Sequence, residues 1–227
     1  MLVCAMAPVK PSLAPDRRRP ARPKSRRNRG LSQAKNRAIL DAAARIFLES
    51  GFHHASMDRI ARKARVSKQT VYNHYRAKED LFSAIICDRA GGLVSGLAQR
   101  LHKGGRTADA LTAFGEDFLS FLLSPAILAF YRLLVAEGGR RSELGAIAYA
   151  QGPARAVETL AAFLAERSRM GEMRVPDPRS SAEMLLGLLR GQHQLRALFG
   201  AGPAPSPQNL KAWVAGAVET FLAAHRA

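Results

Sequence analysis

The chain has 227 residues, of which 47% are hydrophobic, and a formal net charge of +17 at pH 7. This length allows one large domain or two small ones, and the composition is sufficient for a buried core. The apolar residues are mostly Ala and Leu at helical spacing, which predicts an all-α protein and argues against a sheet-based fold. Charged residues and prolines interrupt the longest apolar runs, so we expect no membrane span.

The positive charge is concentrated at the N-terminal end. Residues 1–30 hold nine Lys and Arg against one acidic residue and are rich in Pro. Because such a segment has little apolar surface to bury, we predict a disordered basic arm over residues 1–30. Two interpretations stay open, an arm that follows a phosphate backbone or enters a minor groove, and a plain solvated tail. The charge asymmetry favours a polyanionic partner.

Residues 31–90 are predicted to form three helices and the start of a fourth. The first covers 33–50, with Ser32 as its N-cap and Gly51 after its last turn. The fourth begins at Lys78 and continues to about Leu101, where a Gly-containing break follows.

The second and third helices predict a helix-turn-helix over residues 56–75. Ser56 caps the second, whose apolar residues repeat at i, i+3, i+4 and i+7 from Met57. After a two-residue break at Arg65-Val66, Ser67 caps a third helix over residues 68–75. Two short helices joined by a tight turn are typical of this motif.

The third helix carries polar side chains opposite its apolar side. At about 100° per residue, Gln69, Thr70 and Asn73 lie away from the buried side, and Tyr72 and His74 lie on the flanks. Gln and Asn amides can pair with adenine, and a Thr methyl can meet a thymine methyl. A solvated polar helix would have a similar face, but the preceding capped helix, the turn and the local charge favour DNA.

The segment that carries these features is AILDAAARIFLESGFHHASMDRIARKARVSKQTVYNHYRAKEDLF. It closely resembles the N-terminal DNA-binding domain of TetR-type transcriptional regulators. The resemblance implies a homodimer on a roughly palindromic double-stranded operator, and repression that a small-molecule effector in the C-terminal domain relieves. Position by position, it implies contacts with bases, nearby phosphates or the DNA backbone. With the two capping serines, the expected DNA-binding residues are Ser56, Ser67, Lys68, Gln69, Thr70, Tyr72, Asn73, His74 and Lys78.

Two positions depart from the family pattern. Arg65 stands where the family most often has Gly in the turn, and a non-Gly residue in a left-handed conformation costs on the order of 1 kcal/mol. We therefore expect an adjusted turn. Ala77 replaces the usual Ser or Asn before the fourth helix, so we expect that helix to lack a side-chain cap.

Residues 91–227 are predicted to form a ligand-binding and dimerisation bundle. Its helices are expected near 107–123, 125–137, 142–170, 179–199 and 206–225, which gives about nine helices in the chain. The segment resembles, more loosely, the C-terminal domain of AefR-like regulators. Arg141-Ser142 departs from that pattern, where Phe-Pro is expected.

Two sets of candidate residues follow for this bundle. The aromatic candidates for a ligand pocket are Phe114, Phe118, Phe121, Phe130, Tyr131, Tyr149 and His193. The candidates for a dimer interface, on the last two long helices, are Met184, Leu185, Leu188, Leu189, Trp213, Val214, Ala217 and Phe221. Both sets equally fit the core of one protomer, and periodicity does not separate the alternatives. Since a single recognition helix contacts too few bases for specificity, an obligate dimer is expected.

The sequence thus predicts a sequence-specific transcriptional regulator, a dimeric repressor released by a small molecule. The alternative is a sequence-indifferent basic DNA-binding protein. The only cysteines, Cys4 and Cys87, argue against a disulfide framework and fit a reducing cytoplasm. We expect no enzyme, cofactor or metal site, because the sequence has no HExxH, P-loop, dinucleotide fingerprint or CxxC motif.

Overall fold

The structure is a computed structural model that describes residues 26–101, 105–138 and 142–226. These residues form eleven helices and no strand, which confirms the predicted all-α class. Most of the expected N-terminal arm lies outside the described residues. Its last part, from Arg26 onwards, is already helical, so the arm was predicted to extend too far.

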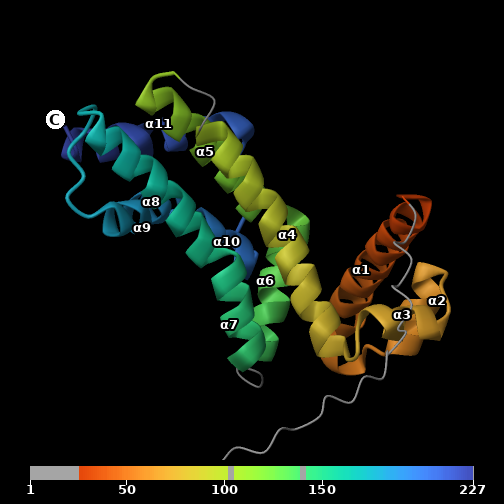
Figure 1. The fold of residues 1–227 in the computed structure, drawn as a ribbon. Helices are drawn as coiled ribbons and strands as arrows, with labels where there is room; N and C mark the ends of the chain where they lie inside the picture. The colour runs from red at the N-terminus through yellow and green to blue at the C-terminus, as the bar shows by residue number, and fades with distance from the viewer. Residues whose placement is uncertain (1–25, 102–104, 139–141, 227) are drawn as a thin grey trace, which may run out of the picture.

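The N-terminal domain consists of α1 (Arg26–His54), α2 (Met57–Ala64), α3 (Lys68–His74) and the first turns of α4 (Lys78–Leu101). It forms a separate lobe at the right of Figure 1. Three mutually packed aromatic rings lie in its core, with centroids 5.2–5.4 Å apart, and belong to Phe47, Phe52 and Phe82. The predicted helices of this domain are confirmed in order and type.

The first helix differs from the prediction at its start. The helix begins at Arg26, so Ser32 lies inside α1 and not at its start. The predicted end of the helix agrees more closely with the structure, because Gly51 has φ 75° and interrupts the helical backbone there. A positive φ has little cost for glycine, which explains why the break falls at this residue.

The C-terminal bundle contains more helices than the prediction allowed. The expected helices over 142–170 and 179–199 are each divided in two, by Gly152-Pro153 and by Gly191-Gln192. Proline has no backbone N–H and is tolerated in the first turn of a helix, where that donor has no partner. The helices of the bundle are α5 (Thr107–Leu122), α6 (Pro125–Gly138), α7 (Ser142–Gln151), α8 (Pro153–Arg169), α9 (Pro178–Arg190), α10 (His193–Phe199) and α11 (Pro207–Ala224).

Helix α4 connects the two parts of the molecule (Figure 1). Leu81 and Phe82 belong to the core of the N-terminal domain, whereas Leu97 and Leu101 belong to the core of the bundle. Among the described helices, α4 is long and apolar enough to cross a membrane, as is the pair of α5 and α6, bent by 63°, if it is counted as one span. Part of the apolar surface of α4 is buried in these two cores.

A close contact fixes the break between α9 and α10. Gly191 has φ 46° and ψ −140°, and Trp213 packs against it so closely that a Cβ would lie 2.5 Å from ring atom Cζ2. The Trp213 indole N–H donates a hydrogen bond of 2.9 Å to the Leu189 carbonyl oxygen. Only glycine satisfies both the backbone conformation and the space at this position.

We therefore expect Gly191→Ala to lower the free energy of unfolding by about 1–3 kcal/mol from backbone strain alone. Gly145→Ala is the matched control, because Gly145 lies within α7 and a Cβ there meets nothing within 4 Å. The control should stabilise the protein by about 0.5–1 kcal/mol. Urea unfolding followed by circular dichroism measures both, and equal effects would contradict the role assigned to Gly191.

Candidate DNA interface and ligand cavity

Two serine caps position α2 and α3. The Ser56 hydroxyl oxygen accepts a hydrogen bond from the Arg59 N–H at 3.3 Å, and the Ser67 oxygen accepts one from the Thr70 N–H at 3.1 Å. Both caps were predicted from the sequence and are confirmed. Each one satisfies a backbone donor that the first helical turn leaves without a partner.

The turn between α2 and α3 is a Schellman motif. The Val66 N–H donates to the Ala61 carbonyl oxygen at 3.1 Å, and the Arg65 N–H donates to the Arg62 carbonyl oxygen at 3.2 Å. Arg65 has φ 56° and ψ 41°, in the left-handed region that usually takes glycine here. The turn therefore keeps the geometry of a glycine turn, and the expected adjustment does not occur.

Helix α3 ends at His74, one residue earlier than predicted. Tyr75 follows in an extended conformation, and its hydroxyl donates a hydrogen bond of 2.7 Å to Asn36 Oδ1 on α1. Burial raises the pKa of the Tyr75 hydroxyl, so it remains a neutral donor at physiological pH. This bond fixes the end of α3 to the first helix.

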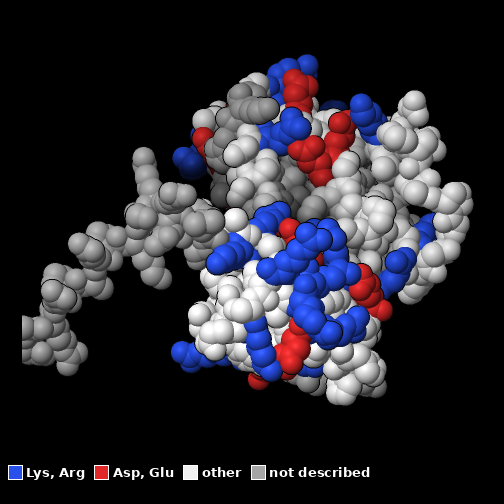
Figure 2. Space-filling model, turned by 90° about the vertical axis from the view of Figure 1, so that its right-hand side faces the viewer, with Lys and Arg blue, Asp and Glu red and all other residues white. Residues whose placement is uncertain are grey.

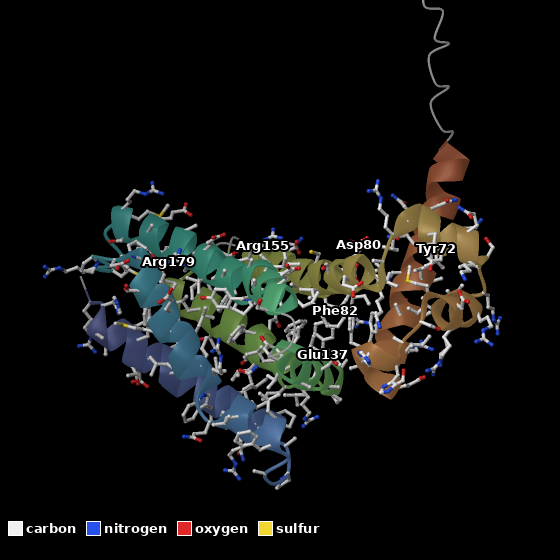
Figure 3. All side chains as sticks on the ribbon, turned by 90° about the horizontal axis from the view of Figure 1, so that it is seen from below. Tyr72, Asp80, Phe82, Glu137, Arg155 and Arg179 are labelled. Carbon is white, nitrogen blue, oxygen red and sulfur yellow. The ribbon has the colours of Figure 1, made fainter. Side chains whose placement is uncertain are left out.

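The outer face of α3 is free of core contacts. Val71 is fully buried, whereas Tyr72 is 41% exposed. Figure 3 shows Tyr72 in the N-terminal domain, apart from the bundle. The Gln69 amide donates to Asn73 Oδ1 at 2.9 Å, one turn along the same face. The predicted base-contacting amides therefore lie side by side on an exposed surface.

Basic side chains surround this face. Lys and Arg gather on the side of the molecule that the N-terminal domain forms (Figure 2). Lys68 Nζ lies 2.8 Å from Asp58 Oδ1, and hydrogen bonding to this carboxylate raises the pKa of Lys68. The Ser67 and Thr70 hydroxyl oxygens lie 2.8 Å apart, and His74 is exposed at the end of the helix.

Lys78 makes contacts that the sequence did not indicate. Its ammonium donates to the carbonyl oxygens of Phe52 and His53 at 3.0 Å and of Ala55 at 3.4 Å. It also lies 4.9 Å from the centre of the Phe52 ring. Lys78 therefore joins the end of α1 to the start of α4, and its expected contact with the DNA backbone stays a prediction.

The start of α4 has a cap that the sequence analysis missed. One Asp80 carboxylate oxygen accepts hydrogen bonds of 3.1 Å from the backbone N–H groups of Arg76 and Ala77. The expectation that Ala77 leaves the helix without side-chain capping is thus wrong. An acidic residue three positions into a helix is the available signal, because it can reach back to the first donors.

A cavity of about 250 Å³ lies in the bundle, between α4, α5, α6, α7, α8 and α9. Four of the predicted pocket residues line it, namely Phe118, Phe121, Tyr131 and Tyr149. The other three do not line it. Phe114 is buried in the bundle core, Phe130 stacks on Phe82 with centroids 5.4 Å apart, and His193 packs edge-on against Trp213 at 5.0 Å.

Helix α9 supplies the polar part of the cavity. Glu183, Leu186, Gly187 and Arg190 all line it and follow the i, i+3, i+4, i+7 spacing of one helical face. Sequence reasoning missed the two charged residues because it considered aromatic side chains alone, although this spacing was visible. Burial raises the pKa of the Tyr131 hydroxyl. The nearby charge of Arg190 and a hydrogen bond with Gln194 lower this pKa and only partly offset the effect of burial.

The predicted dimer residues divide into two groups. Met184, Leu188 and Trp213 are exposed, with Met184 at 62%. The remaining candidates are buried in the core of their own protomer: Leu185, Leu189, Val214, Ala217 and Phe221. Apolar residues three or four positions apart lie on one broad side of a helix. Part of that side is buried and part is exposed, so the sequence pattern alone did not separate the two groups.

The fold and the α2–α3 surface define the class of this molecule, a helix-turn-helix DNA-binding protein with a C-terminal helical domain. Within the described residues, no group of three His, Cys, Asp or Glu side chains is arranged to hold a metal ion. Residues 39–85 match the model of the tetR family of bacterial regulatory proteins, and residues 109–227 match that of the AefR-like transcriptional repressor C-terminal domain. The chain belongs to the TetR family and is a DNA-binding transcriptional regulator, not an enzyme.

Known relatives agree with this assignment. A TetR-family regulator from Mesorhizobium loti has the same fold with a TM-score of 0.79 and 28% identity, over 86% of this chain and 98% of that one. The flavonoid-responsive regulator FrrA gives 0.71 and 30% identity over the same shares.

Curated relatives match over shorter segments. FasR, a transcriptional activator of Mycolicibacterium smegmatis, is 35% identical over 105 residues, 46% of this chain and 48% of FasR. UidR of Escherichia coli is 50% identical over 48 residues, 21% of this chain and 24% of UidR. The chain thus spans about half of FasR and about a quarter of UidR in these alignments.

The contacts of Lys78 generate a prediction on stability. Lys78→Met should lower the free energy of unfolding by about 1–3 kcal/mol, because three carbonyl groups lose a charged donor, two of them in half-buried hydrogen bonds. Lys63→Met is the control, since the Lys63 ammonium meets only the exposed Glu49 carboxylate, at 3.1 Å. It should change stability by less than about 1 kcal/mol. If urea unfolding shows the same small effect for both variants, the hydrogen bonds of the Lys78 ammonium do not contribute to stability.

Proposed function

We propose that the protein is a homodimeric repressor that recognises a palindromic operator through α3 and is released when a small molecule binds in the bundle cavity. The observation that carries the proposal is the outer face of α3, where the exposed side chains of Gln69 and Asn73 hydrogen bond to each other. Amide groups on an exposed helix match the edge of adenine in a major groove. The regulator would act on DNA in the cytoplasm.

Contacts with the phosphate backbone fix the position of α3 in this proposal. Tyr72 and His74 lie on the flanks of the helix, and the hydroxyl groups of Ser56 and Ser67 lie at the starts of α2 and α3. Lys68 adds a charge at the same end. Such contacts set the register of the protein on the duplex without discriminating between bases.

The dimer is proposed to form through α9, α10 and α11. These helices expose large apolar side chains, which are Met184, Leu188, Leu195, Phe199 and Trp213. Exposed apolar side chains on adjacent elements are typical of interaction surfaces. Two-fold pairing places two α3 helices on two half-sites, which a single recognition helix cannot do.

The cavity suggests the chemical class of the effector. A volume of about 250 Å³ suits a compact ligand, because pockets for drug-sized molecules measure roughly 300–1,000 Å³. Phe118 and Phe121 offer aromatic walls, and Tyr131 and Arg190 offer a hydroxyl group and a cation. We propose a small aromatic molecule with a hydroxyl or carboxylate group, and the flavonoid response of FrrA is consistent with this class.

Helix α6 is proposed to transmit ligand binding to the DNA-binding domain. Three consecutive residues of this helix contact three different parts of the molecule. Phe130 stacks on Phe82 of α4, and Tyr131 lines the cavity. The Arg132 guanidinium donates to the carbonyl oxygens of Ala197 and Leu198 on α10, at 2.7 and 2.9 Å. A ligand that displaces Tyr131 would therefore move the neighbour of Phe82.

Competition binding tests the proposed DNA recognition. A duplex selected by the protein from a random pool should bind at least about 10³-fold more tightly than a random duplex, with two protomers per site. Gln69→Ala and Asn73→Ala should each relax preference at particular base pairs by about 1–3 kcal/mol. Tyr72→Phe is the control and should weaken binding to all duplexes alike.

Equal affinity for the selected and the random duplex would instead support a sequence-indifferent basic DNA-binding protein. That alternative is motivated by the concentration of positive charge in residues 1–30. If all three substitutions weaken binding without changing base preference, the assignment of the outer face of α3 to base contacts is wrong.

The proposed effector class is tested with the flavonoid naringenin as the probe. Trp213 is the only tryptophan and packs against Gly191, beside Arg190, so its emission should change saturably on binding. Arg190→Met should weaken binding about tenfold, because a hydrogen bond to a charged group is lost. Arg169→Met, on an exposed residue that does not line the cavity, should have no effect. Non-saturable quenching, or equal loss in both variants, would contradict the proposal.

A further inference from the structure

Arg65 is the only non-glycine residue with a positive φ among the described residues. Its conformation belongs to the turn, because the Schellman hydrogen bonds at the end of α2 require a left-handed residue there. Gly or Asn would adopt this conformation at lower cost than Arg. Strained residues of this kind persist in proteins mainly at functional positions.

The side chain of Arg65 makes no contact with the described residues that would compensate for the cost of its backbone conformation. It is exposed, and within the part of the chain that the structure describes no hydrogen bond or ion pair to its guanidinium is found. Three other basic residues of this motif have partners, whereas the exposed Arg62 has no such contact among the described residues. Lys68 pairs with Asp58, Lys63 pairs with Glu49, and the Arg59 guanidinium donates to the Ser50 hydroxyl at 3.2 Å.

The position of Arg65 relates it to the DNA interface. It lies two residues before the Ser67 cap and three before Lys68, at the end of α3 that carries these groups. A guanidinium there is free to meet a phosphate beside the groove that α3 enters. Arginine is suited to this contact because its planar fork binds phosphate oxygens bidentately.

We propose that Arg65 is an additional phosphate-binding residue, which contacts the DNA backbone from the turn of the helix-turn-helix. The left-handed backbone is retained in this position because the guanidinium adds affinity for DNA that glycine would not. The inference rests on the proposed placement of α3 in a major groove. It adds a contact that strengthens binding to every duplex and does not discriminate between bases.

The test is the salt dependence of DNA binding by the full-length protein. Arg65→Asn and Arg65→Gly both keep a residue that tolerates the left-handed conformation, so their melting temperatures should not fall below that of the unmodified protein. Each should reduce the slope of log Kd against log salt concentration by about 0.9, the value for one lost phosphate contact. Arg65→Lys keeps the charge and should keep the slope.

Arg155→Asn is the matched control for net charge. Arg155 is an exposed residue of α8, and Figure 3 shows it on the bundle, far from Tyr72 of α3. Its substitution removes the same charge and should leave the slope unchanged. An unchanged slope in Arg65→Asn, or an equal reduction in Arg155→Asn, would overturn the proposal.

The measurement is made on both the selected duplex and the random duplex. If the unmodified protein does not distinguish the two, the proposed operator recognition fails, whereas the contribution of Arg65 to the slope is still measured. If it does distinguish them and Arg65→Asn changes neither slope, only the role of Arg65 fails.

Discussion

The aromatic packing around Phe82 is the contact on which the arrangement of the two halves depends. This residue lies at the start of α4, fully buried, with the rings of Phe47 and Phe52 on one side and Phe130 of α6 on the other. Because one ring belongs to both the DNA-binding domain and the contact with the bundle, neither can move without changing its packing. Close-packed interiors transmit such displacements instead of absorbing them. An apolar contact, which Leu144 of α7 extends in the same core, therefore contributes to the orientation of α3 relative to the cavity.

Polar contacts also hold the connection between α1, α3 and α4. The Lys78 ammonium satisfies carbonyl groups after the last turn of α1, and the Asp80 carboxylate satisfies N–H groups before the first turn of α4. Both side chains belong to the first turn of α4, so a single turn organises the connection between α1, α3 and α4. The Tyr75–Asn36 hydrogen bond adds a direct link from the end of α3 to α1. The hydrogen bonds of Lys78 with Phe52 and Ala55 and that of Tyr75 with Asn36 are half-buried. Such groups are costly when unpaired, which makes the geometry specific.

The sequence predicted these features to different degrees, for physical reasons. The caps at Ser56 and Ser67 depend on neighbours within a few residues, so local patterns were sufficient. The left-handed turn at Arg65 was not predicted, because an adjusted turn was expected for a non-glycine residue. The conformation of Gly191 depends on Trp213, which lies 22 positions further along the chain, and helical periodicity contains no such information. The cavity was partly predictable. Tyr131 and Phe114 are both aromatic residues at helical spacing. Only the packing of six helices decides that Tyr131 lines the cavity and that Phe114 lies in the core.

In the proposed mode of DNA binding, recognition and stability depend on opposite faces of α3. Val71 is fully buried and holds the helix on the domain, whereas Gln69 and Asn73 are exposed and hydrogen bond to each other. Substitutions on the outer face can therefore change the recognised bases with little effect on folding, as expected for exposed positions away from caps and cores. Arg65 differs from these outer-face residues, because the fold requires its left-handed backbone conformation but makes no use of its side chain. In the proposed mode of binding, the Arg65 guanidinium adds affinity for DNA that offsets the cost of a backbone conformation which glycine would adopt more easily.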